Sequence, residues 1–427
     1  MKRSLFAGVT RSLLCGAVAL SACGDPMPPE EDGPIIVGLA YGTADSAAQV
    51  EGALLAAAEV NAVGGVQGRQ IEVVPIDTQM DPPTARDNIE RFVRDNPGVK
   101  GIVGPIRGFA AVFAAPIAHR EQIPMINIGG AYLPAFRDSN PADDRYAYSV
   151  RMSRVDEARR AGIALRDVVG CNTALFIAGY VRGAEQEIVS AFESEFSGEG
   201  RELVGWHRHL PEFTDFGSTL RPYTSDPPDC IFLGVDELPG ILFINSWADI
   251  GGAPTTRMIY GFEPQPELFS RYLTNPSYYE ELWAMGQELN DTGPAGVRFR
   301  EQYMATFGEE APEFASARYD AMAILLLGMA SATSLEGPDI RDAMIRVSRD
   351  DTSDPSERTH TAGELDFALQ TAARGFDMSY QGASGRFELG PDGSAANRVF
   401  RVWRVDDVEA GEYTQVAVLE GGDGEDP

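Results

Sequence analysis

Apolar residues fall into short runs and helically spaced segments that alternate from residue 35 onward. The short runs predict buried strands at residues 35–39, 70–76, 101–103 and 124–128. The segments between them predict helices at residues 46–61, 84–94 and 109–120. Strands separated by helices of this length are typical of a parallel sheet covered on both faces.

The same alternation restarts after Tyr148. It predicts helices at residues 156–169 and 184–196, and strands at residues 174–177, 203–209, 231–235 and 258–261. Two successive α/β units in a chain of 427 residues indicate two α/β domains. Parallel strands in such units are joined by right-handed crossovers.

The last third of the chain is more helical. Helical spacing predicts helices at residues 296–307, 315–332 and 340–346, and the polar, aperiodic stretch 349–364 predicts a loop. Residues 385–389 and 398–405 are expected to form a hairpin around the turn Pro391-Asp-Gly393. Residues 411–427 are assigned to a C-terminal tail with a strongly acidic end.

The N-terminus has the pattern of a secretion signal. Positive residues precede the apolar run 13–22, which is too short to span a bilayer and predicts a signal peptide at residues 1–22. The run ends Leu20-Ser-Ala-Cys23, which resembles the bacterial lipobox and implies acylation of Cys23. The alternative is a chance apolar start followed by a cysteine. The Pro-rich, acidic residues 23–33 are expected to form a tether.

The formal net charge of −29 narrows the possible partners. It argues against nucleic-acid binding, which needs clustered basic residues, and against docking on an anionic membrane surface. Contact with a membrane is therefore expected only through the N-terminal lipid.

Two of the four cysteines remain after signal removal and acylation. Cys171 and Cys230 each stand just before an apolar run. If these runs are neighbouring parallel strands, the two thiols lie side by side and a disulfide is geometrically reasonable in an oxidising compartment. Two buried free thiols are the alternative, and the sequence leaves both open.

Several motifs stand in a characteristic order between Ile35 and Val405. The most specific is Glu59-Val-Asn61 followed by Gly64-Gly-Val-Gln-Gly-Arg-Gln-Ile-Glu72. The others are Asp77–Pro82, Ile102–Pro105, Ile123–Ile126, Tyr319–Met322 and Tyr380–Gly385 with Phe387. In this order they resemble the type I periplasmic binding proteins of the leucine/isoleucine/valine-binding group, the soluble receptors of ABC importers.

The resemblance implies an α/β clamshell of two doubly wound parallel-sheet lobes joined by a three-strand hinge. The first lobe would comprise residues 34–149 and 285–375, and the second residues 150–284 and 376–410. A small-molecule ligand would bind between the lobes at the carboxyl ends of the strands, where helix N-termini point.

Loops after the strands of the first lobe supply one set of candidate ligand contacts. Where amino-acid-binding members of the family have a Ser or Thr hydroxyl, this chain has Gly108, and Gly129, Gly130 and Ala131 stand where the family often has a Ser/Thr-rich turn. Backbone N–H groups can still bind an anion there. Arg107 either binds a carboxylate through two parallel hydrogen bonds or is a surface residue at the start of a helix. Tyr41 either stacks on the ligand or fills the wall.

Tyr180, Asp236 and Glu263 follow strands of the second lobe. Glu263 matches an acidic residue that pairs with the ligand ammonium in the family, and it is the first choice for a ligand contact. Asp236 is the second. The alternative for both is a solvated loop carboxylate, which is common in so acidic a chain.

The sequence lacks the motifs of common enzymes. It contains no nucleophile elbow, dinucleotide fingerprint or Walker loop. His207 and His209 alternate on one strand without a third ligand, which is a poor metal site. No catalytic residue, metal or cofactor is therefore expected, and an extracytoplasmic hydrolase is disfavoured.

The sequence predicts a lipid-anchored, extracytoplasmic substrate-binding protein of an ABC importer, a monomer that captures an amino acid, amide or related metabolite. Its partners would be this ligand and a permease in the inner membrane. The alternative is a cell-envelope sensor or scaffold lipoprotein of the same fold that binds a protein partner; Gly108 and Ala131, in place of hydroxyl residues, favour it.

Overall fold

The computed structural model describes residues 33–42, 47–79, 81–105, 108–129, 144–180, 183–210, 212–287, 293–312, 314–349, 358–396, 398–408 and 410–419. The predicted signal peptide, Cys23, most of the tether and the end of the acidic tail lie outside these residues. Among the described residues, no helix combines the length and apolar character needed to cross a membrane.

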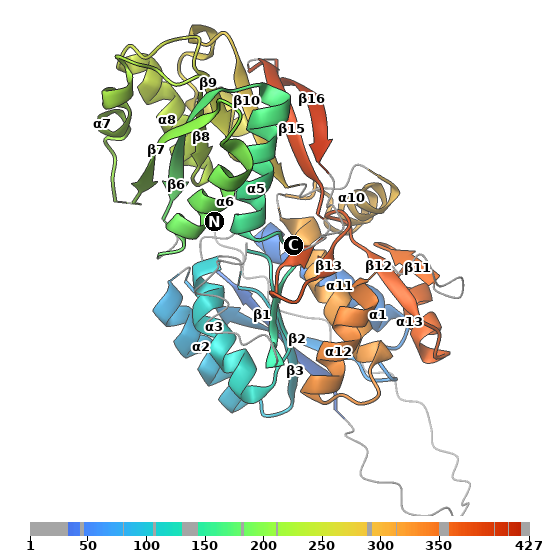
Figure 1. Cartoon of the computed structure of the whole chain (residues 1–427). Helices are drawn as coiled ribbons and strands as arrows, with labels where there is room; N and C mark the ends of the chain where they lie inside the picture. The colour runs from blue at the N-terminus through green and yellow to red at the C-terminus, as the bar shows by residue number, and fades with distance from the viewer. Residues whose placement is uncertain are drawn as a thin grey trace, which may run out of the picture. The chain divides into compact units, whose positions relative to one another are not determined.

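The first lobe is built on a parallel sheet of five strands in the order β2-β1-β3-β4-β5 (Figure 1). The strands are β1 (Ile35–Tyr41), β2 (Ile71–Asp77), β3 (Val99–Val103), β4 (Met125–Asn127) and β5 (Ala147–Ser149). Helices α1 (Ala47–Ala62), α2 (Pro82–Asp95) and α3 (Gly108–Glu121) connect the first four strands. These elements confirm the alternation predicted from the sequence to within a few residues.

Alternate residues of β1 enter separate cores on the two faces of this sheet. Val37 and Leu39 join the core formed with α1, whereas Ala40 joins the core formed with α2 and α3. Helix α2 begins at an N-cap, Asp81, whose side chain accepts a hydrogen bond from the Thr84 N–H at 3.0 Å. The short apolar runs therefore form strands because both of their faces are buried.

The second lobe is built on seven strands in the order β16-β15-β10-β9-β8-β6-β7. Five are parallel: β6 (Thr173–Gly179), β7 (Glu202–His209), β8 (Cys230–Gly234), β9 (Arg257–Tyr260) and β10 (Leu282–Gln287). The antiparallel strands β15 (Phe400–Asp407) and β16 (Glu412–Leu419) extend the sheet at one edge.

Helices cover both faces of this second sheet. One core contains α5 (Arg154–Ala164), which continues as a π-helical turn (Leu165–Val169), and α6 (Glu185–Phe196). The other contains α7 (Phe216–Leu220), α8 (Glu237–Asp249) and α9 (Pro266–Tyr272). Two short 3-10 turns are at Arg221–Tyr223 and Pro276–Tyr278.

Cys171 and Cys230 form a disulfide, with their Cα atoms 6.0 Å apart. Cys230 begins β8 and is paired with Ala174 of the neighbouring strand β6. Both cysteines are fully buried. The disulfide thus links the amino ends of two adjacent parallel strands.

The remaining helices complete the first lobe. They are α10 (Pro294–Phe307), α11 (Ala315–Ser331), α12 (Gly337–Ser348) and α13 (Leu365–Ala373). Two small sheets accompany them: β11 (Arg358–Thr361) is parallel to β12 (Met378–Gln381), and β13 (Glu388–Leu389) is antiparallel to β14 (Ala395–Ala396). Strand β11 lies inside the stretch expected to be a loop, so that expectation is wrong for residues 358–361.

The predicted hairpin is also wrong in its pairing. The turn at Pro391–Gly393 joins β13 to β14, whereas β15 pairs with β10 and β16. Phe400 and Val402 are buried in the core of the second lobe, which draws the later strand away from β13. The turn residues correctly predicted where the chain reverses direction, but not which strands pair on either side of the turn.

Two predicted boundaries need correction. Residues 378–395 carry side chains such as Met378, Tyr380 and Phe387 in the core of the first lobe, so the last connection between lobes lies after Ala396 and not at residue 376. Residues 412–419 form strand β16 and are not tail, because this alternating segment packs Ala417 and Leu419 against the second-lobe core.

A buried carboxyl joins α1 to α11, which pack against each other in the first lobe. The Tyr319 hydroxyl donates to Glu59 Oε2 at 2.9 Å and accepts a hydrogen bond from the Gly363 N–H at 3.0 Å. Burial raises the pKa of Glu59 to about 7, although hydrogen bonds from Tyr319 and Gln302 act in the opposite direction. The folded protein therefore binds a proton at Glu59 that the unfolded chain releases near pH 4.5.

Glu59→Gln should stabilise the protein more at pH 8 than at pH 5. The pKa of Glu59 is higher in the folded protein than in the unfolded chain, where it is 4.5. Proton binding at Glu59 therefore stabilises the fold fully below pH 4.5, and this stabilisation is lost as the pH rises through about 7. The difference in unfolding free energy between variant and wild type should grow by about 2–3 kcal/mol, measured by urea unfolding at each pH. Glu51→Gln, which alters the Glu51–Tyr303 hydrogen bond of α1, is the matched control. A difference that does not change with pH would contradict the assignment.

Candidate functional site

Three connections pass between the two lobes, and all of them lie at the carboxyl edges of the parallel sheets. The first leaves β5, which is parallel to β4, and the second leaves β10, which is parallel to β9. The third leads into β15, whose first residue, Phe400, pairs with the last residue of β10, Gln287. The loops that follow the strands of both sheets are therefore directed toward these connections, where α/β proteins bind ligands.

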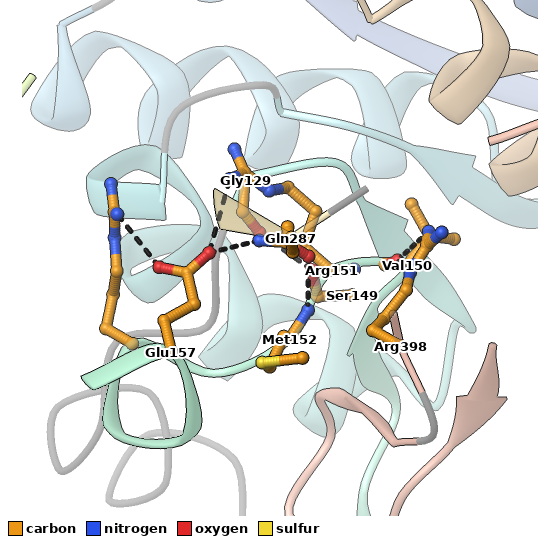
Figure 2. A network of polar contacts seen from close by, with 9 residues as sticks. Gly129, Ser149, Val150, Arg151, Met152, Glu157, Gln287 and Arg398 are labelled. Atoms are coloured by element: carbon orange, nitrogen blue, oxygen red, sulfur yellow. Dashed lines mark hydrogen bonds and ion pairs between the residues drawn. The ribbon is translucent and has the colours of Figure 1, made fainter. Parts of the chain in front are cut away.

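Glu157 is the centre of a polar network at the start of α5 (Figure 2). Its Oε2 accepts a hydrogen bond from Arg154 Nη1 at 2.9 Å, and its Oε1 lies 3.5 Å from Arg151 Nη2. The Arg151 and Glu157 side chains are largely buried. Two guanidinium groups thus share one carboxylate.

Gln287 joins the second connection to the first. Its Oε1 accepts a hydrogen bond from the Met152 N–H at 2.9 Å, and its Nε2 donates to Glu157 Oε1. Gln287 is 2% exposed and is the last residue of β10. One amide side chain therefore satisfies a buried backbone donor of the neighbouring connection.

Arg398 joins the third connection to the first. It is 1% exposed, and its Nε donates to the Val150 carbonyl at 2.8 Å (Figure 2). Its Nη1 donates to the Ser384 carbonyl at 2.6 Å, and its Nη2 donates to Ser384 Oγ at 3.0 Å. The guanidinium also lies over the Phe387 ring, 5.0 Å from its centroid.

Asp320, on α11, fixes the segment that Arg398 contacts. Its carboxylate accepts hydrogen bonds from the Ala383 N–H, from the Ser384 N–H and hydroxyl, and from the Tyr380 hydroxyl, at 2.5–2.8 Å. Burial raises the pKa of Asp320, and these donors act against that shift. A fully buried carboxyl with so many donors is a structural anchor and not a ligand contact.

The structure places three of the first-lobe candidates at the carboxyl edge of their sheet. Tyr41 is the last residue of β1 and is half-buried, and its carbonyl accepts from Thr78 Oγ1 at 2.8 Å. Gly108 is the first residue of α3. Gly129 follows β4, is buried, and its carbonyl accepts from Ser149 Oγ at 2.7 Å. The candidates Arg107, Gly130 and Ala131 lie outside the described residues.

The second-lobe candidates lie at the corresponding edge of the second sheet. Tyr180 follows β6 and is half-buried. Asp236 follows β8 as the exposed N-cap residue of α8, and its side chain makes no capping hydrogen bond. Glu263 follows β9 and is half-buried. Phe262, directly before Glu263, packs under the guanidinium of Arg154, whose Cζ lies 5.4 Å from the ring centroid.

The two strand histidines have packing partners. His207 Nε2 lies 2.8 Å from the Tyr223 hydroxyl, and the His209 ring stacks on Phe216 and meets Phe243 edge-on. Burial lowers the pKa of both histidines. Among the described residues, no group of three or more His, Cys, Asp or Glu side chains is arranged to hold a metal ion.

Two hollows lie on opposite edges of the first-lobe sheet. A groove of about 650 Å³ borders Val99, which begins β3, and Ile123, which precedes β4, so it is at the amino edge. A small void with no room for a water molecule lies at the carboxyl edge, and it is lined by Leu39, Ala40, Val103, Gly104, Ile128 and Arg318. Only the second adjoins the candidate residues.

Sequence reasoning missed the residues that join the connections. Gln287 and Arg398 stand in segments whose pairing was not predicted, so nothing marked them as neighbours of Val150 and Met152. Tyr319-Asp-Ala-Met322 was noted as a family-like stretch, but the role of Asp320 in it was not. Asp320 itself was an available signal, because it and Arg318 are charged residues at the start of a long, mostly apolar run.

The fold and the converging loops define a bilobed α/β binding protein. The sequence matches the family described as "Periplasmic binding protein" over residues 40–406, and the chain belongs to this family. No curated protein sequence matches the chain.

Solved structures with the same fold include several receptors of transporters. The branched-chain amino acid transporter substrate-binding protein LivJ from Streptococcus pneumoniae, in complex with isoleucine, is 17% identical, with a TM-score of 0.68, 91% of this chain covered and 99% of that chain. The leucine-binding protein LivK from Thermotoga maritima is 18% identical, with a TM-score of 0.66 and coverages of 90% and 98%.

A third solved structure binds a different kind of ligand. A solute-binding protein of an ABC transporter from Rhodopseudomonas palustris, in complex with 3,4-dihydroxybenzoic acid, is 16% identical, with a TM-score of 0.65 and coverages of 91% and 98%. At these identities the likeness establishes the fold and leaves the ligand of this chain open.

Gln287→Leu should lower the free energy of unfolding by about 1–3 kcal/mol. The substitution keeps a side chain of similar size but leaves the buried Met152 N–H without its acceptor. Urea unfolding monitored by circular dichroism measures the change. Gln370→Leu, at an exposed position of α13, is the control and should stay within about 0.5 kcal/mol of wild type. Equal effects of the two variants would contradict this role of Gln287.

Proposed function

We propose that the chain is the substrate-binding receptor of an ABC importer and captures a small polar ligand between its two lobes. The observation that carries this proposal is the meeting of both carboxyl edges at the three connections, within a chain that belongs to the periplasmic binding protein family. Solved structures of the same fold hold isoleucine or 3,4-dihydroxybenzoic acid, both of which are small carboxylates. An amino acid, an amide or a related acid is therefore the expected class of ligand.

The proposed mechanism is closure about the three connections. A ligand that contacts both lobes favours the closed arrangement by the free energy of those additional contacts, and the closed form then docks on a permease in the inner membrane. Gln287 accepts a hydrogen bond from the Met152 N–H and Arg398 donates one to the Val150 carbonyl; these bonds keep the connections together, so bending is expected on either side of them. No covalent chemistry is required.

Glu263 and Asp236 are the proposed contacts for a ligand ammonium group. Both follow parallel strands of the second sheet, and the half-buried position of Glu263 gives it the stronger electrostatic effect. Tyr41, Tyr180 and the backbone around Gly108 and Gly129 are the proposed remaining contacts. A ligand held in this way would be enclosed by both lobes.

The proposed location is the extracytoplasmic face of a membrane, with the chain attached through a lipid on Cys23. The family is extracytoplasmic. Residues 1–22 have the pattern of a signal peptide that ends in a lipobox-like sequence. A receptor tethered in this way remains close to its permease.

Glu263→Gln should weaken the binding of ligands that carry an ammonium group by at least about tenfold, because it removes a charged partner. Thermal unfolding of the purified protein with leucine, isoleucine, 3,4-dihydroxybenzoate and their amides identifies the ligand, since a ligand at 100 times its Kd adds about 2.7 kcal/mol of stability. Titration calorimetry then gives the affinity of each variant.

Glu202→Gln is the matched control, because Glu202 is an exposed residue at the amino end of β7 in the same sheet. Its affinity should equal that of the wild-type protein. Binding of an amino acid that is unchanged in Glu263→Gln would refute the role of Glu263. A well-folded protein that binds none of these compounds would favour a sensor or scaffold that recognises a protein partner.

Cys23→Ser should move the protein from the membrane fraction to the soluble fraction of a bacterium that expresses it, because acylation requires the thiol. Immunoblotting of the separated fractions measures the distribution. Cys15→Ser, within the predicted signal peptide, is the control and should leave the protein in the membrane fraction. Retention of Cys23→Ser with the membrane would rule out this anchor.

A further inference from the structure

His209 is a buried imidazole at the carboxyl edge of the second-lobe sheet. It is the last residue of β7 and is paired with Gly179, the last residue of β6. The residue is 9% exposed. Its ring stacks on Phe216 at a centroid distance of 5.2 Å and meets Phe243 edge-on at 5.2 Å. Packing between two aromatic rings therefore fixes the position of the imidazole.

Within the described part of the chain, the ring nitrogens of His209 have no hydrogen-bond partner. Because buried polar groups are normally hydrogen-bonded, an exception of this kind points to a functional role. The other three histidines each have a partner: His119 the Asp144 carbonyl at 2.8 Å, His207 the Tyr223 hydroxyl at 2.8 Å and His360 the Thr371 hydroxyl at 2.9 Å. His209 is thus the histidine whose nitrogens remain available.

Asp236 acts on His209 from the neighbouring helix. It follows β8 as the exposed N-cap residue of α8, the helix that carries Phe243. Its side chain makes no capping hydrogen bond, although aspartate at this position usually makes one. Burial lowers the pKa of His209, whereas the negative charges of Asp236 and of the exposed Glu212 act in the opposite direction. A basic and an acidic group thus interact at this edge without a hydrogen bond between them.

Other described charged groups on the elements around His209 have different interactions. Arg208 points to the other face of β7, where its Nε lies 3.8 Å from Glu185 Oε1. Asp215, before α7, accepts a hydrogen bond from the Ser218 N–H at 3.0 Å. Glu237 is in the first turn of α8, where a carboxylate interacts favourably with the helix dipole. Asp236 and Glu212 therefore remain as the carboxylates that respond to a proton on His209.

We infer that His209 sets the charge of the second-lobe edge and restricts the capture of ligands with an ammonium group to conditions in which its imidazole is neutral. This inference rests on the proposed receptor function, in which Asp236 contacts the ligand ammonium, and adds the regulation of that site by pH. A neutral imidazole leaves the Asp236 carboxylate to the ligand. A protonated imidazole is a competing cation beside the same carboxylate and repels a second one.

The test is the affinity for leucine, isoleucine and leucinamide between pH 7.5 and pH 5, a range that lies above the ordinary pKa values of Asp and Glu. The affinity of the wild-type protein should fall by about tenfold as the pH is lowered, because binding then requires the release of a proton from His209. Titration calorimetry at pH 6 in buffers of different ionisation enthalpy measures this release. Binding of 3,4-dihydroxybenzoate, which has no ammonium group, should not weaken.

His209→Phe keeps the aromatic packing and removes the titrating group. Its affinity for the same ammonium compounds should change by less than about twofold between pH 7.5 and pH 5, and binding should release no proton at pH 6. His209→Gln, which is polar but uncharged, should behave in the same way. Thermal unfolding without ligand shows whether each variant folds.

His207→Phe is the matched control on the same strand. It removes the hydrogen bond to Tyr223, so it should lower stability and keep the pH dependence of binding. Glu59→Gln is the second control, because the pKa of Glu59 is about 7 and this carboxyl titrates in the same range within the first-lobe core. It should also keep the pH dependence. A purely structural histidine at position 209 would behave in the same way as His207.

Each outcome decides the inference. Binding that weakens at low pH in the wild-type protein and in both controls, but not in the two His209 variants, supports it. Binding that does not depend on pH, or that depends on pH equally in wild type and His209→Phe, overturns the role of His209 and leaves the receptor function in place. Wild-type binding restricted to compounds without an ammonium group does the same. A folded wild-type protein that binds none of the compounds overturns both.

Discussion

The guanidinium group of Arg398 determines how the two lobes are joined. It is buried in the third connection and donates hydrogen bonds to a carbonyl of the first connection and to Ser384 of the first lobe. Ser384 is held in turn by the buried carboxylate of Asp320. A buried cation cannot exchange these acceptors for water, so two of the connections are tied to the first-lobe core. Gln287 ties the second connection, which leaves β10, to the first through its hydrogen bonds with Met152 and Glu157.

The same framework positions the candidate site. Because the parallel strands of both sheets end at the connections, the loops that follow these strands are directed toward the connections. Glycine can then replace hydroxyl residues at positions 108 and 129 without loss of the fold, since the framework and not the loops sets the geometry. Ligand specificity is free to change in this fold through a few side chains at the strand ends.

The strands and helices with a regular apolar pattern could be predicted from the sequence, whereas the pairing of the C-terminal strands could not. Apolar runs with both faces buried located β1 to β4 and β6 to β9, because local pattern determines such strands. The two-residue strands β13 and β14 are too short to leave a pattern, and β16 was taken for tail because its face is only half-buried. The resemblance nominated Glu263 as a candidate, whereas nothing in the sequence pointed to Gln287 and Arg398, since their roles depend on contacts distant in sequence.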